Sequence, residues 1–187
     1  MDLQLKNKTA FISGSTAGIG FSIAKSLADE GANVIVNGRS EASVKQAIES
    51  LKSTAKGNVD GFAGDLSIAA EAEKLTKQFP EVDILINNLG IFEPVPFEEI
   101  ADEDWRRFFD VNVLSGVRLT RAYLPAMKQQ NWGRVIFISS ESGVQIPHEM
   151  IHYGMTKAAQ IAIARGLAEQ VAGTNITVNS VLPGPTS

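Results

Sequence analysis

The residues best suited to do chemistry lie between positions 139 and 157. Tyr153 and Lys157 are four residues apart, and on a helix positions i and i+4 lie on the same face, so a phenol and an amine would share one small volume. A phenol in water ionises only near pH 10, and a nearby ammonium group favours the ionised form. The spacing therefore indicates that Tyr153 is a general acid/base and that Lys157 tunes it.

Three serines precede this pair, Ser139, Ser140 and Ser142, and each could donate a hydrogen bond to a substrate oxygen. The alternative is an ordinary helix, because Tyr and Lys four residues apart occur by chance in many helices as a half-buried ring and a solvated amine. The rest of the chain must decide between these two interpretations.

Composition indicates one globular domain spanning residues 1–187. Of the 187 residues, 44% are hydrophobic and 20% charged, which argues against disorder and is enough for one core. The net charge is −4, without a basic run, so we expect neither nucleic acid nor an anionic membrane as a partner.

Cysteine is absent and only two histidines occur, so we expect no disulfide, no thiolate catalysis and no metal site. No apolar run is long enough to span a bilayer. The uncharged stretch 9–24 is interrupted by glycines and hydroxyls, unlike the apolar region of a signal peptide. By elimination, the sequence predicts a cytoplasmic enzyme or binding protein.

A short apolar strand is predicted at 9–13, followed by the glycine-rich turn 14–20 and a helix that ends at Gly31. Such a junction suits a phosphate, because the backbone can approach closely and the helix N-terminus presents free N–H groups. The glycine spacing, Gly14-x3-Gly18-x-Gly20, differs from the usual Gly-x-Gly-x2-Gly. A tight turn without a ligand is the alternative, but three glycines in seven residues favour the ligand.

A second strand is predicted at 33–37, and Arg39 follows it about twenty residues after the glycine turn. An acid at this place would hold an adenosine ribose 2′-hydroxyl. Glu41 is predicted to begin the next helix, so the strand end carries a guanidinium instead, which suits a 2′-phosphate. A solvated loop arginine is the alternative. We predict NADP(H) as the preferred cofactor, with NAD(H) as the other candidate.

The remaining pattern alternates strands and helices. Strands are predicted at 59–63, 83–86, 134–138 and 176–182, and helices at 40–51, 67–79, 102–128 and from about 153 to 173. Ser67 is expected to cap its helix, and Pro125 to bend the long one. This alternation predicts an α/β fold, a doubly wound parallel sheet in three layers.

In such folds ligands bind at the carboxyl ends of the strands. The candidate groups all fall at this edge, which is the strongest argument for a ligand site: the glycine turn, Arg39, Asp65, Asn88, Ser140 and Pro183.

Taken together, these residues resemble the short-chain dehydrogenase/reductase family over essentially the whole chain. The matching stretches are Ser13-Gly14-x3-Gly18-Ile19-Gly20, with Ser where Thr is usual; Asn87-Asn88-Leu89-Gly90, with Leu in place of a small residue; Tyr153-x3-Lys157, with Ser140 thirteen residues before the tyrosine and Asn112 in the preceding long helix; and Pro183-Gly184.

The resemblance implies a Rossmann-like sheet in the order 3-2-1-4-5-6 and hydride transfer between a nicotinamide and a carbonyl or alcohol carbon. Ser140 would hold the substrate oxygen and Tyr153 would transfer its proton. Lys157 would favour ionisation of the phenol and bind the nicotinamide ribose, while Asn112 would position a proton-relaying water. The expected cofactor contacts are Gly14, Ser15, Thr16, Gly18, Ile19, Gly20, Arg39, Asp65, Leu66, Asn88, Gly90, Tyr153, Lys157, Pro183 and Gly184.

Two functional classes stay open on the sequence alone. One is a reductase or dehydrogenase for a small-molecule carbonyl or alcohol, such as a 3-oxoacyl thioester, a ketosteroid-like ketone or a sugar. The other is a nucleotide-binding regulatory or scaffold protein without turnover, although an intact acid/base set favours the enzyme.

Two further expectations concern assembly and length. Small residues are dense between 158 and 168, which suits helix pairing in a homodimer or homotetramer. Close packing of this helix onto the chain's own sheet is the alternative. Members of the resembled family continue past the Pro-Gly turn with a substrate-covering segment and a last strand. We therefore expect residues 1–187 to be most of a longer enzyme, C-terminally incomplete relative to the family.

Overall fold

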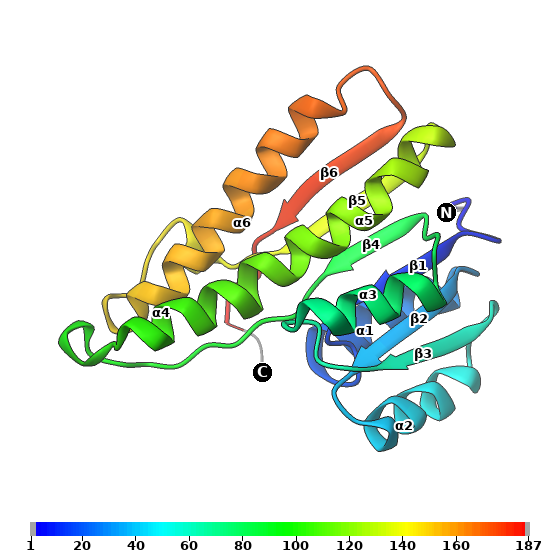
Figure 1. Cartoon of the computed structure of the whole chain (residues 1–187). Helices are drawn as coiled ribbons and strands as arrows, with labels where there is room; N and C mark the ends of the chain where they lie inside the picture. The colour runs from blue at the N-terminus through cyan, green and yellow to red at the C-terminus, as the bar shows by residue number, and fades with distance from the viewer. Residues whose placement is uncertain (1–2, 186–187) are drawn as a thin grey trace.

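The computed structural model describes residues 3–185 and contains one six-stranded parallel sheet in the order β3-β2-β1-β4-β5-β6 (Figure 1). This is the predicted order. The strands are β1 Thr9–Ile12, β2 Asn33–Gly38, β3 Val59–Ala63, β4 Ile84–Asn87, β5 Gly133–Ile138 and β6 Ile176–Val181. The α-helices are α1 Gly18–Asp29, α2 Glu41–Lys52, α3 Ala69–Gln78, α4 Asp102–Phe109, α5 Ser115–Gln129 and α6 Ile151–Gln170.

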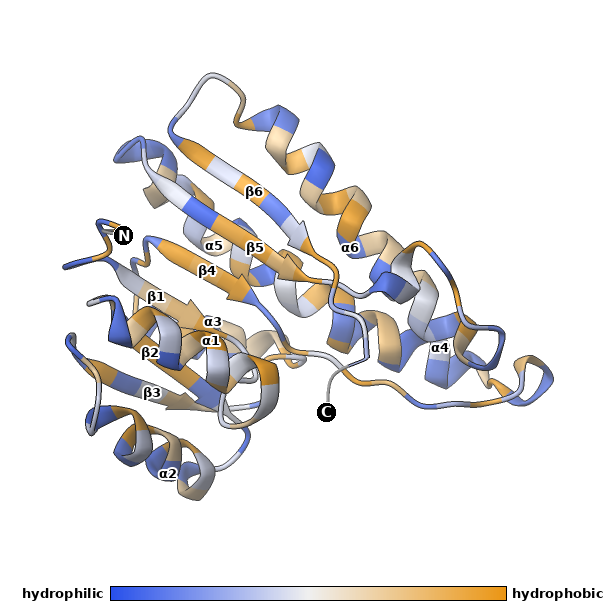
Figure 2. Ribbon diagram, turned by 180° about the vertical axis from the view of Figure 1, so that it is seen from behind, coloured by the Kyte–Doolittle hydropathy of each residue, from blue (hydrophilic) through white to orange (hydrophobic). Residues whose placement is uncertain are grey.

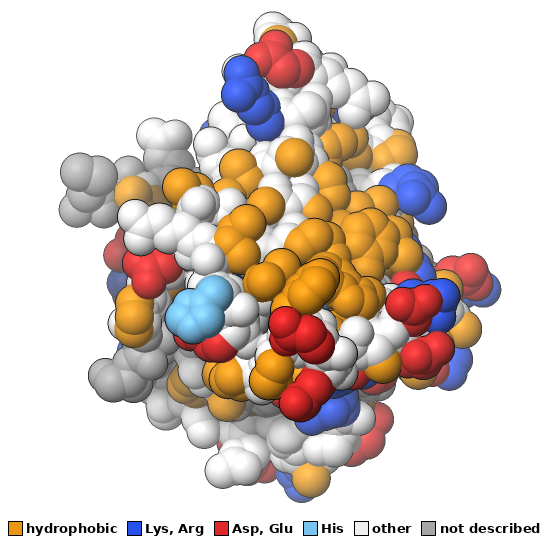
Figure 3. Space-filling model, turned by 90° about the vertical axis from the view of Figure 1, so that its left-hand side faces the viewer, with side chains coloured by type: hydrophobic (Ala, Val, Ile, Leu, Met, Phe, Trp, Pro, Cys, Tyr) orange, Lys and Arg blue, Asp and Glu red, His pale blue; other side chains and the backbone are white. Residues whose placement is uncertain are grey.

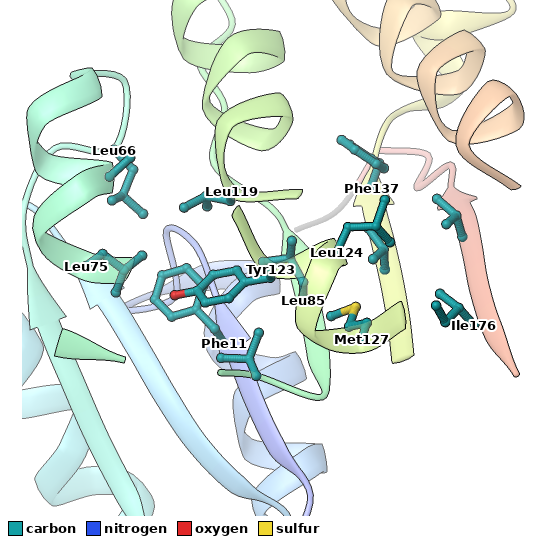
Figure 4. Packing of buried hydrophobic residues seen from close by; sticks show 14 of the residues in the cluster. Phe11, Leu66, Leu75, Leu85, Leu119, Tyr123, Leu124, Met127, Phe137 and Ile176 are labelled. Atoms are coloured by element: carbon teal, nitrogen blue, oxygen red, sulfur yellow. The ribbon is translucent and has the colours of Figure 1, made fainter. Parts of the chain in front are cut away.

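The two faces of the sheet bury separate hydrophobic clusters, because successive strand side chains point to opposite faces. Phe11 and Leu85 pack with α3 and α5, whereas Ile12 and Ile86 pack with α1 and α2. Figure 4 shows part of the first cluster, with the rings of Tyr123 and Phe11 drawn together near Leu75 and Leu85. Figure 2 shows that β1, β4 and β5 are largely hydrophobic, as expected for strands covered by helices.

The predicted long helix 102–128 is interrupted in the structure. Between α4 and α5, residues Asp110–Leu114 form a π-helical segment, η2, whose wider turn is a feature often found at functional sites. Pro125 lies within α5, which continues to Gln129. The helical span was therefore predicted correctly, and the π segment was not.

The predicted cap of the third helix was wrong. Ile68 occupies the N-cap position of α3 without a side-chain hydrogen bond. The Ser67 hydroxyl instead donates to the carboxylate of Asp65, at 2.6 Å, because the chain turns once more before the helix begins. Ser40 caps α2 by accepting from the N–H of Ser43. Within residues 3–185, no helix is long and apolar enough to cross a membrane.

Candidate active site

The glycine turn between β1 and α1 is built around close backbone contacts. Gly14 and Gly18 have φ values of 60° and 58°, a region that favours glycine. A Cβ on Gly20 would lie 2.5 Å from Nδ2 of Asn88 and from the Gly14 carbonyl oxygen, so only glycine fits there. The turn therefore holds its shape through the absence of side chains.

The turn is clamped to the end of β4. The Asn88 side chain donates from Nδ2 to the carbonyl oxygens of Ser13 and Gly14, at 3.0 and 2.8 Å. The Ser13 hydroxyl accepts from the N–H groups of Asn88 and Leu89. Asn88 thus acts on the turn itself, in addition to lining the pocket described below.

Asn37, at the end of β2, is a residue that the sequence analysis missed. Its Oδ1 accepts from the N–H of Gly14 at 3.0 Å, and its Nδ2 donates to the carbonyl oxygens of Phe62 and Gly64. One buried amide therefore ties the first three strand ends together. A polar residue among the apolar residues of a central strand was the signal that could have identified it.

The start of α1 fits a phosphate group. The N-cap residue Ala17 makes no side-chain cap hydrogen bond, so the first-turn N–H groups stay available to an anion. A Cβ on Gly18 would meet no atom within 4 Å, which leaves open space in front of the turn. Ser15 is fully buried, its hydroxyl donates to the Ile12 carbonyl and its N–H donates to the Asn37 carbonyl, so this predicted cofactor contact supports the shape of the turn and exposes no surface to a ligand.

The other residues predicted to contact the nucleotide differ in how far they are exposed to solvent. Arg39 is exposed directly after β2, and Thr16 packs beside Gly38 at the same strand end. Asp65 is half-buried and accepts from Ser67. Leu66 as a whole residue is 1% exposed within the core, so neither its side chain nor its backbone presents a surface to a ligand.

The phenol and amine lie on one face of α6, as the spacing predicted. Nζ of Lys157 lies 5.6 Å from the centre of the Tyr153 ring. The ring is half-buried and makes an edge contact with Phe92, with centroids 6.2 Å apart. The two groups are therefore close enough for the ammonium to act on the phenol.

Lys157 is buried, and its ammonium donates to the Ile138 carbonyl oxygen at 2.9 Å. Burial lowers the pKa of the Lys157 ammonium from 10.5 to about 8, because a charged group is disfavoured away from water. The lysine thus titrates close to neutral pH, where a tuning group for acid/base chemistry is useful.

The three serines are in different environments. The Ser139 hydroxyl donates to the main-chain carbonyl of Lys157 at 2.8 Å, so its proton is already used in holding α6 on β5. The Ser140 hydroxyl accepts from the N–H of Ser142, and no acceptor for its own proton is found among residues 3–185. The Ser142 hydroxyl has no acceptor among these residues either, but Ser142 does not line the pocket described below, whereas Ser140 does. Ser140 is therefore the serine of the pocket whose proton is available to a ligand.

Asn112 lies in the π segment, is 1% exposed and forms hydrogen bonds through both ends of its side-chain amide. Its Oδ1 accepts from the Ile91 N–H, and its Nδ2 donates to the Ile91 carbonyl and to the Thr156 hydroxyl, which in turn donates to the Tyr153 carbonyl. Its main-chain carbonyl accepts from Nε2 of Gln160 at 2.5 Å. Asn112 therefore fixes the loop after β4 against α6.

Neither Thr156 nor Gln160 was singled out from the sequence. Gln160 is three residues after Lys157, so the same helical spacing that pairs Tyr153 with Lys157 places it nearby. A polar residue on a buried helix face was the available signal.

A pocket of about 210 Å³, called here the Tyr153 pocket, gathers much of the predicted site. It is lined by Ile19, Asn88, Gly90, Ile91, Phe92, Ile138, Ser139, Ser140, Tyr153, Lys157, Pro183 and Gly184. Gly14, Ser15, Thr16, Gly18, Gly20, Arg39, Asp65 and Leu66 lie outside this lining, on the first three strand ends and the glycine turn, and Asn112 lies behind it against Gly90.

The surroundings of the pocket are apolar. Phe92 is 69% exposed, and Phe97 and Ile146 are also exposed. Figure 3 shows hydrophobic side chains gathered on the side of the molecule that carries α4 and the start of α6, with acidic side chains beside them.

A doubly wound sheet with a glycine turn after its first strand and a Tyr–Lys pair on the helix after its fifth is typical of Rossmann-type oxidoreductases. Residues 8–187 match the short chain dehydrogenase family. The chain belongs to this short-chain dehydrogenase/reductase family and is an oxidoreductase acting on the carbonyl/alcohol pair.

Relatives and solved structures agree with this assignment. The uncharacterized oxidoreductase YvaG of Bacillus subtilis is 52% identical over 100% of this chain and 71% of its own length. The crystal structure of L-sorbose reductase from Gluconobacter frateurii, complexed with NADPH and L-sorbose, has a TM-score of 0.92 at 34% identity, covering 98% of this chain and 72% of that one. NAD+-bound xylitol dehydrogenase has a TM-score of 0.89 at 26% identity, covering 97% and 71%.

Proposed function

We propose that this protein is an NADP(H)-dependent oxidoreductase that interconverts a small-molecule ketone and its secondary alcohol. The observation that carries the proposal is the convergence of Ser140, Tyr153 and Lys157 on one pocket at the sheet edge that also holds the glycine turn. When bound, the nicotinamide would supply the hydride. The residues of the chain would bind and orient the cofactor and the substrate, and would exchange the proton with the substrate oxygen.

The dinucleotide would be held along the carboxyl edge of the sheet. The glycine turn and the uncapped start of α1 suit its diphosphate. Arg39 suits a 2′-phosphate, and Asn88, Gly90 and the Pro183-Gly184 turn suit the nicotinamide half. The NADPH complex of the sorbose reductase supports a nicotinamide cofactor.

In reduction, the hydroxyl protons of Ser140 and Tyr153 would face the substrate oxygen. A developing alkoxide needs donors that are already in place, and Tyr153 would give its proton to that oxygen. Lys157 would stabilise the resulting phenolate through its charge. In oxidation the same groups would act in reverse, with Tyr153 as the base.

Asn112 would act through one of its oxygens. Both N–H donors of its side chain are used in fixing Ile91 and Thr156, so a proton-relaying water would have to donate to Oδ1 or to the main-chain carbonyl oxygen. Each of these oxygens has two lone pairs; the Ile91 N–H occupies one on Oδ1, and Gln160 occupies one on the carbonyl.

The direct test is an assay of NADPH oxidation with a panel of apolar ketones, 3-oxoacyl thioesters and ketoses, in which the loss of NADPH absorbance is monitored. The proposal expects turnover with at least one class. A protein that binds NADPH and turns over none of these carbonyls, nor the matching alcohols with NADP+, would contradict it and favour a binding protein.

We expect the parent protein to bind NADPH more tightly than NADH, and Arg39→Ala to weaken NADPH binding about tenfold or more. Arg39 is exposed at the end of β2, and a charge-assisted hydrogen bond contributes about 1.5–3 kcal/mol. NADH affinity should change little. Fluorescence titration of both cofactors measures the difference.

Lys45→Ala is the matched control, because Lys45 is an exposed cation on the neighbouring helix α2. It should leave both affinities unchanged. Equal affinities of the parent for NADPH and NADH would refute the preference.

We further propose that the chain forms a homo-oligomer through α5 and α6. A groove of about 370 Å³ between the two helices is lined mainly by aliphatic side chains such as Val117, Leu124 and Leu167. Ala162 on α6 is exposed beside it, and a Cβ on Gly166 would meet no atom within 4 Å. Small side chains permit the close approach of a second helix pair.

Light scattering at micromolar concentration should give at least twice the mass of one chain, and Ala162→Glu should lower it by placing a carboxylate in the contact. A parent protein that is monomeric at this concentration would refute the proposed homo-oligomer.

A further inference from the structure

Gln160 is a buried amide that joins two parts of the active site. It lies on α6, is 1% exposed and uses both ends of its side chain. Nε2 donates to the main-chain carbonyl of Asn112 at 2.5 Å, and Oε1 accepts from Nζ of Lys157 at 3.3 Å. The amide orientation is dictated by chemistry, because a carbonyl can only accept and an ammonium can only donate.

The hydrogen bond between Gln160 and Lys157 determines the directions in which the N–H bonds of the ammonium point. Lys157 has three N–H donors, of which one goes to Ile138 and one to Gln160. One donor is therefore left for a ligand or for the phenol side of the pocket. With two fixed acceptors, the direction of the third N–H is defined.

The partner at the other end is supplied by the π segment. The wider turn of Asp110–Leu114 lies against α6, and the Asn112 carbonyl accepts from a side chain of another helix. A buried amide group that lacks a hydrogen-bond partner at one end costs free energy. Each of the two hydrogen bonds of Gln160 therefore favours the arrangement that the other one needs.

We propose that Gln160 is a positioning residue that links the main-chain carbonyl of Asn112 to the Lys157 ammonium and thereby holds this ammonium, charged and oriented, beside Tyr153. The proposal rests on the function proposed above. It adds a side chain to the groups that fix the Lys157 ammonium.

The electrostatic consequence has a definite sign. Burial disfavours the charged form of Lys157, whereas an oxygen that accepts from its ammonium favours that form. The charged or titratable groups on the elements packed around it are Tyr153, His152, Arg165 and Glu169 on α6, His148 and Glu149 in the turn before α6, Asp110 in η2, Arg134 on β5, Glu141 in the turn after β5, and the acids and arginines of α4. Burial is the cause of the Lys157 pKa shift, and none of these charges contributes to it.

Two substitutions separate positioning from simple packing. Gln160→Met keeps the length of the side chain but removes both hydrogen bonds. It should lower the pKa of Lys157 further, by about one unit, and reduce kcat about tenfold, with the alkaline limb of its pH profile moved to lower pH. Gln160→Glu restores an acceptor for the ammonium and should return this limb to the parent position or to higher pH.

The decisive readout does not depend on turnover. NMR titration of the lysine side chains, with the Lys157 signal assigned by its loss in Lys157→Met, measures the pKa in the protein without substrate. Gln78→Met, an exposed glutamine on α3, is the matched control and should change neither the pKa nor kcat.

The expected order of the Lys157 pKa is Gln160→Met below the parent, and Gln160→Glu at or above it. An unchanged pKa in folded Gln160→Met, or variants that lose thermal stability and activity in parallel without any pH shift, would overturn the proposal. If the parent shows no reductase activity, the proposed function fails, and the NMR titration still decides the role of Gln160.

Discussion

Replacing Tyr153 by phenylalanine is expected to lower kcat at least about a hundredfold, while the Kd for NADPH stays nearly unchanged. The substitution removes the hydroxyl that would exchange the substrate proton, an effect typically of this size. It keeps the ring and its edge contact with Phe92, so the pocket should keep its shape. Steady-state kinetics together with cofactor titration measure both quantities.

The chain offers a matched control in its second tyrosine. Tyr123 is fully buried in the core, and its hydroxyl has no hydrogen-bond partner within the described residues. Tyr123→Phe should therefore leave kcat unchanged. If Tyr153→Phe retained a substantial part of the activity, another group would have to be the acid.

Replacing Ser140 by alanine is expected to lower kcat about a hundredfold, as is usual when one donor to a developing oxyanion is lost. The Ser140 hydroxyl keeps a proton available to a ligand, whereas that of Ser139 is used by the Lys157 carbonyl. The same assay should show that Ser142→Ala has little effect.

Ser140 also accepts from the N–H of Ser142 at the start of a short 3-10 turn, so a loss of activity could follow from a disturbed turn. Ser140→Thr keeps the hydroxyl and should recover much of the activity at an unchanged melting temperature. Ser142→Ala keeps the N–H that Ser140 accepts, so equal activity losses in Ser140→Ala and Ser142→Ala would show that the Ser140 hydroxyl is not the specific donor.

The fold was largely readable from the sequence because its signals are local and repeated. Apolar runs such as 34–36, which is followed by a periodic helix at 40–51, predict a parallel sheet, and the structure has one. The carboxyl ends of such strands share one edge, which is why Asn88, Ser140 and Pro183 were predicted to lie near one another; all three line the Tyr153 pocket.

What the sequence could not indicate depends on contacts between distant segments. The π segment arises where the chain around Asn112 meets Ile91 and α6, and no local pattern marks it. Asn37 was read as part of an apolar strand, yet its amide joins three strand ends. For Gln160, the helical spacing gave the nearness to Lys157, but the bond to Asn112 required the structure.

The central claim, hydride transfer between a nicotinamide and a carbonyl carbon, is tested most directly with deuterated cofactor. NADPH carrying deuterium at the transferring position of the nicotinamide would be incubated with the protein and the carbonyl compound that the panel identifies, and the alcohol analysed by mass spectrometry. The account predicts deuterium bound to the carbinol carbon with the parent protein, and far slower labelling with Tyr153→Phe. Alcohol formed without deuterium on that carbon would contradict it.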